Sequence, residues 1–358
     1  AFVFCLIQVT YSVTKDLSAL NLLRGLLMVL LLWTIWVGFA WIGNARTEKE
    51  DISRLGWFRV MVVAAMATLV ILGRTVPTGF QSESNVFAGA FVILFVLYVI
   101  GFLYVTRDSP RNRRSFLTVL PGQALLPLAV VGAAFFDSVP WSPILITVGL
   151  IASYLSAQLR VPGDWDISLT HADERFGLFI LIVLGETIIA LGFGAYYAVF
   201  DFKVVIAIVC GIIFATALWW IYFSLIAQQA SEVLATMTRE DQSRVSRLVY
   251  TYLHALLVVS VAALAVGLEV LAANPEQRLP RPLNLILPGS LALFLVTILV
   301  IRRVLTGKAP WQLLIPAALL LVVMPLGLVL PALWAEVICA GILAFFILSR
   351  ELQTLSDR

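Results

Sequence analysis

VVIAIVCGIIFATALWWIYF, residues 204–223, carries no basic side chain along its length. A helix of about 20 apolar residues is long enough to cross the hydrocarbon core of a bilayer, which is about 30 Å thick. Two more runs have the same character, AFVILFVLYVIGFLYV (90–105) and LVVSVAALAVGLEVLAA (257–273). Each of these stretches predicts a membrane-spanning helix.

The composition of the whole chain agrees with this prediction. The chain is 61% hydrophobic and 13% charged, with a mean hydropathy of +1.00. Soluble domains are about 45–50% apolar and about 25% charged. We therefore expect an all-α, polytopic membrane protein, a single integral membrane domain over 1–358, with neither a cofactor nor a nucleic-acid partner. Cys5, Cys210 and Cys339 lie in apolar runs without metal or disulfide spacing and are typical of buried core residues.

Apolar runs separated by polar breaks predict about twelve helices. They lie near 1–14, 21–43, 57–76, 86–105, 116–136, 142–159, 174–195, 203–228, 247–272, 283–301, 310–329 and 331–349. The first is too short to span a bilayer, so we expect the chain to start inside that helix. Only the region of Pro331 separates the last two, which leaves a count of eleven open.

The basic residues predict the orientation of the chain. The loops after the even-numbered helices and the C-terminal tail hold 18 of the 24 Lys and Arg residues, including Arg46, Lys49 and Arg54. Basic loops stay on the cytoplasmic side, so both termini are expected to face the cytoplasm. The loop RDSPRNRRS (107–115) either contacts anionic lipid headgroups or serves only to fix this orientation.

The chain shows signs of an internal repeat. WTIWVGFAWIGN (33–44) in the second helix resembles ALWWIYFSLIAQQ (217–229) in the eighth. A separation of six helices relates two halves, 1–160 and 161–358, by an axis along the membrane normal. Tryptophans also recur in the interfacial belts of any membrane protein. Trp36 and Trp220 lie deeper than such a belt and are therefore candidates for the polar core.

Most acids lie in predicted loops, but Glu186, Glu269 and Glu336 lie inside predicted helices, as does His254. A charge at the bilayer centre costs about 2.5–3.5 kcal/mol on insertion scales, so such groups face the protein interior or a water-filled cavity. Glu186 lies eleven residues after Arg175 and shares its helical face. Glu269 and Glu336 are expected near the outer surface, where a carboxylate reaches water.

Arg247, Tyr250 and His254 form one stripe of the ninth helix. Glu186 and His254 are predicted at comparable depths, where they would form a proton-handling pair if they meet. The alternative is that Glu186 stays protonated and hydrogen-bonds to a neighbouring helix as a packing contact.

The segment SLTHADER (168–175) precedes Glu186. Thr170 and Asp173 have the spacing of a capping box, and acids such as Asp173 and Glu174 favour the first turn of a helix. Arg175 is expected to pair with one of these acids or with a facing helix. His171 and His254 are the only histidines, which excludes a histidine-rich metal site. No nucleotide-binding loop, zinc spacing or nucleophile elbow occurs in the chain.

The seventh helix resembles the signature of the bacterial low temperature requirement A family. The matching residues are His171, Glu174-Arg175, Leu178-Phe179 and Leu184-Gly185-Glu186, with Gly43-Asn44, YTYLH (250–254), Gly267 and Glu269 as further features. The family usually opens its first helix with Glu-Leu-Phe, an aromatic residue and Asp, and this chain begins beyond that point. The resemblance implies a multi-pass bacterial membrane protein linked by name to growth in the cold, without a defined substrate. A fainter similarity to six-plus-six-helix potassium channels is analogy only.

We interpret the chain as a channel or a proton-coupled transporter for a small solute or cation in the bacterial inner membrane. Glu186 would be the central group of the pathway, His254 its partner, and Arg175 would guard the inner mouth. Two alternatives remain open, a membrane-embedded enzyme or lipid-binding protein, and a sensor or scaffold without transport activity. Membrane lipids are the expected surroundings, and a homodimer is an open alternative to a monomer.

Overall fold

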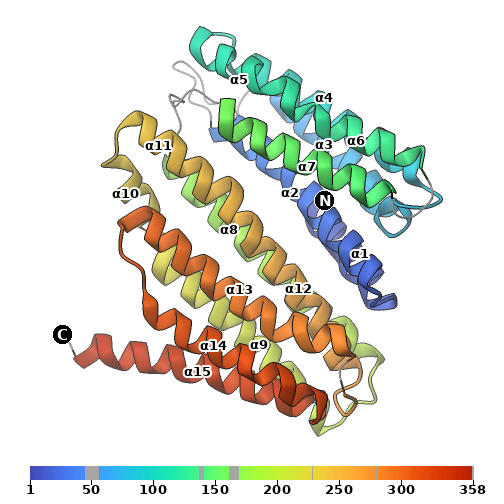
Figure 1. Ribbon diagram of the computed structural model, residues 1–358, viewed down its shortest axis with the longest axis vertical. Helices are drawn as coiled ribbons and strands as arrows, with labels where there is room; N and C mark the ends of the chain where they lie inside the picture. The colour runs from blue at the N-terminus through green and yellow to red at the C-terminus, as the bar shows by residue number, and fades with distance from the viewer. Residues whose placement is uncertain (45–55, 137–140, 161–168, 228, 279, 357–358) are drawn as a thin grey trace. The chain divides into compact units, whose positions relative to one another are not determined.

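The computed structural model describes residues 1–44, 56–136, 141–160, 169–227, 229–278 and 280–356. Every regular element in these ranges is a helix, which confirms the predicted all-α class (Figure 1). Arg46, Lys49 and Arg54 of the predicted inner loop lie outside the described residues.

Among the described residues, 11 helical segments are long and apolar enough to cross a membrane. A further helix, α1 (Phe2–Lys15), has 14 residues and is too short to span alone, as the sequence predicts. Long apolar helices satisfy all backbone hydrogen bonds internally, which is what the bilayer interior demands. The fold is therefore that of a polytopic helical membrane protein.

The helices form two compact units. The first comprises Ala1–Ser12, Leu20–Ala172 and Ala235–Arg247, and the second comprises Val13–Ala19, Asp173–Leu234 and Leu248–Arg358. This division falls close to the predicted halves 1–160 and 161–358. It differs in that a segment from each half belongs to the other unit. A repeat between the halves stays a prediction.

Unit 1 is built from helices that pair along the chain. Its long helices are α2 (Ala19–Asn44), α3 (Gly56–Thr75), α4 (Ser84–Val105) and α7 (Trp141–Arg160), and α5 (Pro110–Gln123) and α6 (Leu125–Ala134) together form one further span. The short η2 (Val76–Thr78) and α11 (Arg239–Ser246) complete the unit. The pairs α3 with α4 and α6 with α7 lie in contact. An aromatic core holds one end together, where Phe102 stacks on Phe116 with ring centroids 4.4 Å apart.

Unit 2 contains most of the longest helix among the described residues, α8. Its elements are α8 (Leu169–Tyr197, from Asp173), α9 (Phe202–Tyr222), η3 (Phe223–Ala227), α10 (Ala230–Ala235), η4 (Arg247–Leu253), α12 (His254–Ala273), α13 (Arg281–Thr306), η5 (Trp311–Leu313), α14 (Leu314–Val323), η6 (Met324–Leu328) and α15 (Ala332–Ser356). Helix α13 packs on α12 and α14, and α15 packs on α9 (Figure 1).

Four predicted helices are interrupted in the structure, and in the one over 310–329 the 3-10 turns η5 and η6 flank α14. The predicted helix 116–136 is two helices, α5 and α6, because Pro121 and Pro127 cannot donate backbone hydrogen bonds. The predicted helices 203–228 and 247–272 each contain a π-helical segment, η3 and η4. No proline marks the π segments, so hydrophobic pattern alone predicts uninterrupted α-helices there.

The exterior of each unit is apolar along the spans. On α3, for example, Val60 is 70% and Val63 is 64% exposed. In water such an apolar surface would promote aggregation, but lipid tails are as apolar as these side chains and cover them without cost. The buried polar residues are therefore the more informative part of the structure.

Candidate functional site

Helix α8 presents its polar residues in two directions. His171 and Glu174 are exposed, whereas Asp173 is 8% exposed and Glu186 is 1% exposed. Arg175 is half-buried between these two sets. His171 and Glu174 therefore lie on the exposed side of α8. Asp173, which the sequence does not mark as a pathway residue, lies on the buried side.

Asp173 ties α8 to two other elements of unit 2. Its Oδ2 accepts a hydrogen bond of 2.7 Å from the backbone N–H of Ser231, in α10. Its Oδ1 accepts a hydrogen bond from the hydroxyl of Tyr250, in η4. The predicted capping role of Asp173 is wrong, because the helix begins at Leu169 and both carboxylate oxygens bind groups of other elements.

His254 is fixed by hydrogen bonds at both ring nitrogens. Nδ1 lies 2.8 Å from the carbonyl oxygen of Val249, and Nε2 lies 3.0 Å from the hydroxyl of Tyr222. A carbonyl oxygen only accepts, so Nδ1 carries a hydrogen. In the neutral ring Nε2 then accepts from Tyr222, and in the charged ring the direction of that bond reverses.

Phe176 joins the two hydrogen-bonded pairs into one cluster. Its ring centroid lies 4.8 Å from that of Tyr250 and 5.3 Å from that of His254. The rings of Tyr250 and His254 are themselves 5.4 Å apart. We call Asp173, Tyr222, Tyr250 and His254, with Phe176 among them, the tyrosine–histidine cluster. In each hydrogen-bonded pair, Tyr250 with Asp173 and Tyr222 with His254, a proton can be shared between the two bonded atoms.

Both π-helical segments lie at this cluster. Segment η3 begins directly after Tyr222, and segment η4 contains Tyr250 and ends directly before His254. A π-helical turn accommodates an extra residue and redirects the side chains beside it, and such turns occur frequently at functional sites. The backbone irregularity and the buried polar groups of unit 2 therefore coincide.

Glu186 does not lie at the level of His254, contrary to the prediction. The ring of His254 contacts Phe176, which precedes Glu186 by ten residues, or about 15 Å along a helix. The register of α8 against α12 is set by the contacts of Asp173 with Tyr250 and of Gly194 with Glu269. Glu186 therefore lies at another level of the α8–α12 pair, and both ring nitrogens of His254 bond to other groups, Val249 and Tyr222.

Helices α8 and α12 approach closely at their far ends. A Cβ atom on Gly194 would lie 2.9 Å from the carbonyl carbon of Glu269, and closer still to its oxygen. The half-buried side chain of Glu269 accepts a hydrogen bond of 3.2 Å from Thr14. Its carboxylate thus lies at the opposite end of the α8–α12 pair from the tyrosine–histidine cluster.

Glu336 is buried more deeply than predicted. The sequence predicts that it reaches water near the outer surface, but it is 1% exposed on α15, a helix that packs against α9. Its Oε2 has no hydrogen-bond partner among the described residues. Glu336 is therefore a third buried acid of unit 2, beside Asp173 and Glu186, and it lies on α15, outside the tyrosine–histidine cluster.

The remaining candidates are distributed over the two units. In unit 1, Trp36 stacks on buried Trp33 with centroids 5.3 Å apart, and Arg247 is half-buried. In unit 2, Trp220 is 38% exposed and its indole N–H donates a hydrogen bond of 3.1 Å to Glu351. Within the described ranges, no group of three or more His, Cys, Asp or Glu side chains is arranged to hold a metal ion.

The helices and buried acids define a polytopic membrane protein with ionisable groups buried among its apolar helices. Residues 1–348 match the family described as Bacterial low temperature requirement A protein (LtrA), so the chain belongs to this family and the resemblance seen in the sequence is confirmed. It is 27% identical over 326 residues to uncharacterized protein RA0937 of Rhizobium meliloti (strain 1021), covering 87% of this chain and 76% of that protein. No solved structure matches the chain.

Proposed function

We propose that the protein transports protons together with, or in exchange for, a small solute or cation along the α8–α12 pair of unit 2. One observation carries the proposal: titratable side chains occur at three levels of this pair. The tyrosine–histidine cluster lies at one end, Glu186 lies between, and Glu269 lies at the other end.

The length of this series supports a path across the membrane. From Asp173 to Gly194, which contacts Glu269, α8 rises about 31 Å. The hydrocarbon core of a bilayer is about 30 Å thick. Buried ionisable groups in spanning helices are costly, and they typically mark ion pathways and proton relays.

The tyrosine–histidine cluster is suited to pass a proton in small steps. Tyr250 donates to Asp173, and His254 exchanges a hydrogen bond with Tyr222, so neighbouring groups offer both donors and acceptors. The stretch of about 15 Å between His254 and Glu186 is the part that must hydrate or move during a transport cycle. In this proposal Glu186 binds the proton or cation at mid-membrane.

The orientation of the path follows from the basic loops. We propose that the protein lies in the bacterial inner membrane with both termini in the cytoplasm. Both Asp173, near the start of α8, and the cluster around it would then face the cytoplasmic side. Arg175, half-buried and nearly two turns from the first residue of α8, would lie at the inner mouth of the path.

Proton and potassium flux in proteoliposomes tests this function. We expect Asp173→Asn and Glu186→Gln each to reduce flux at least about tenfold, because each removes a titratable group while conserving shape. The matched control is Glu240→Gln, which changes an exposed acid of α11, outside the α8–α12 pair, and should leave flux at the wild-type level. Folded wild-type protein without flux of either ion, or unchanged flux in Asp173→Asn and Glu186→Gln, would refute the proposal.

A further inference from the structure

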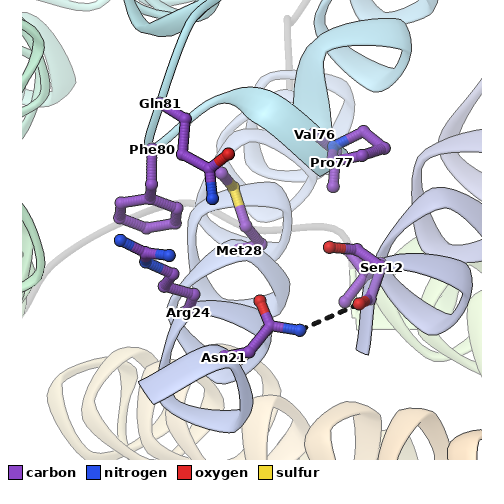
Figure 2. A pocket seen from close by; sticks show the side chains of 10 residues that line it. Ser12, Asn21, Arg24, Met28, Val76, Pro77, Phe80 and Gln81 are labelled. Atoms are coloured by element: carbon purple, nitrogen blue, oxygen red, sulfur yellow. Dashed lines mark hydrogen bonds between the residues drawn. The ribbon is translucent and has the colours of Figure 1, made fainter. Parts of the chain in front are cut away.

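Unit 1 contains a cavity that the transport path in unit 2 does not use. The cavity has a volume of about 20 Å³, enough for about one water-sized group. It lies where the end of α1, the first turns of α2 and the segment after α3 meet (Figure 2). Its floor is apolar, formed by buried residues such as Val9, Met28 and Val76.

The rim of the cavity offers hydrogen-bond donors. Arg24, Asn21, Ser12 and Gln81 all line it, and none of the residues lining it is acidic. The amide of Asn21 donates to the carbonyl oxygen of Ser12 at 2.8 Å, which holds α1 against α2 at this point. Gln81 is exposed, so the cavity reaches the surface of the unit on its side.

Arg24 is the charged group of the cavity. Its guanidinium lies beside the ring of Phe80, 5.7 Å from the centroid, as Figure 2 shows. Its Nε is buried and has no hydrogen-bond partner among the described residues. A guanidinium has five N–H donors in a planar fork that matches the oxygens of a carboxylate or phosphate.

A second arginine of the same unit shows the contrasting arrangement. Arg74 is exposed, and its guanidinium donates a hydrogen bond of 3.0 Å to the carboxylate of Glu83. The positive charge of Arg74 is therefore balanced within the chain. Around Arg24, by comparison, the lining supplies an aromatic ring, amides and a hydroxyl but no carboxylate.

We propose that this cavity binds one anionic oxygen group, a carboxylate or phosphate, with Arg24 as the charged donor and Gln81 as a neutral one. The small volume admits only the anionic tip, so the rest of the ligand would lie outside the cavity, past Gln81. The group can belong to a dissolved anion or to a lipid phosphate. The recognition chemistry is the same in both cases.

The test compares anion-dependent stability of the purified full chain. In neutral detergent, sodium phosphate and sodium acetate are titrated while the midpoint of thermal unfolding is measured, since a ligand of the folded state raises that midpoint. In the second arm, phosphatidylcholine nanodiscs are compared with and without phosphatidylglycerol. A rise in the first arm identifies a dissolved anion, and a rise confined to the second identifies a lipid phosphate.

We expect Arg24→Gln to weaken anion affinity about tenfold or more, and Arg74→Gln to respond to anions as the wild type does. If Arg24→Gln does not fold, Gln81→Ala serves instead and should weaken affinity roughly threefold or more. The proposal is overturned if no probe in either arm stabilises the wild type. It is also overturned if the anion response survives both Arg24→Gln and Gln81→Ala.

Discussion

Replacing Gly194 by alanine should separate α8 from α12. A Cβ atom at this position would lie 2.9 Å from the carbonyl carbon of Glu269 and 3.0 Å from the Cβ of Ala272. Ordinary van der Waals contact begins at 3.4 Å, so the helices must move apart by at least about 0.5 Å. The obstacle is backbone, which cannot rotate away as a flexible side chain can. Overpacking of this kind costs about 1–3 kcal/mol of unfolding free energy.

A control on the same helix isolates this effect. Gly192 has no atom within 4 Å of an added Cβ, so Gly192→Ala gains only the helix propensity of alanine, about 0.5–1 kcal/mol. The two substitutions should therefore shift the unfolding midpoint in detergent in opposite directions. Equal shifts, or stabilisation by Gly194→Ala, would refute the close approach on which the α8–α12 register rests.

Two further predictions concern hydrogen bonds. Tyr222→Phe leaves Nε2 of buried His254 without its partner and should lower the free energy of unfolding by about 1–3 kcal/mol. Chemical denaturation measures this free energy, and a value equal to that of the wild type would contradict the Tyr222–His254 hydrogen bond. The hydrogen bond from Thr78 lowers the pKa of Glu83 below its ordinary value of 4.5, and the charge and hydrogen bond of Arg74 each add a smaller effect in the same direction. A carboxyl whose pKa falls on folding stabilises the protein above its unfolded pKa and loses this contribution as pH falls through the folded pKa. The advantage of wild type over Glu83→Gln should therefore be present near about pH 6 and shrink below pH 4.5, in thermal unfolding followed against pH.

The membrane class and most helix positions could be predicted because each spanning helix needs a long run of apolar residues, and such runs are visible in the sequence. Twenty apolar residues in a row have few alternatives to a spanning helix. The short α1 and the helix near 331–349 were found on this basis alone. The interruptions at η3 and η4 were not, since a π-helical turn has the same composition as the α-helix around it.

The candidate site was harder to predict because it depends on the register in which neighbouring helices pack. Glu186 and His254 are recognisable as buried ionisable groups, but their relative depth depends on where each helix begins. The spacing of Asp173 from Thr170 predicts a capping box. The structure instead places it against Tyr250, and only a tertiary contact decides between those roles.

The π-helical segment η4 gives α12 a freedom that a regular helix lacks. It holds one surplus residue over Arg247–Leu253, between the polar end of the helix and the long apolar remainder. If the π-helical turn, with its extra residue, shifts along the chain, each residue that it passes rotates by about 100° around the helix axis, while both ends of the helix stay in place. Tyr250, inside the segment, and His254, at its edge, are the first side chains such a migration would turn. Such a shift would change the neighbours of these two side chains without displacing the remainder of α12.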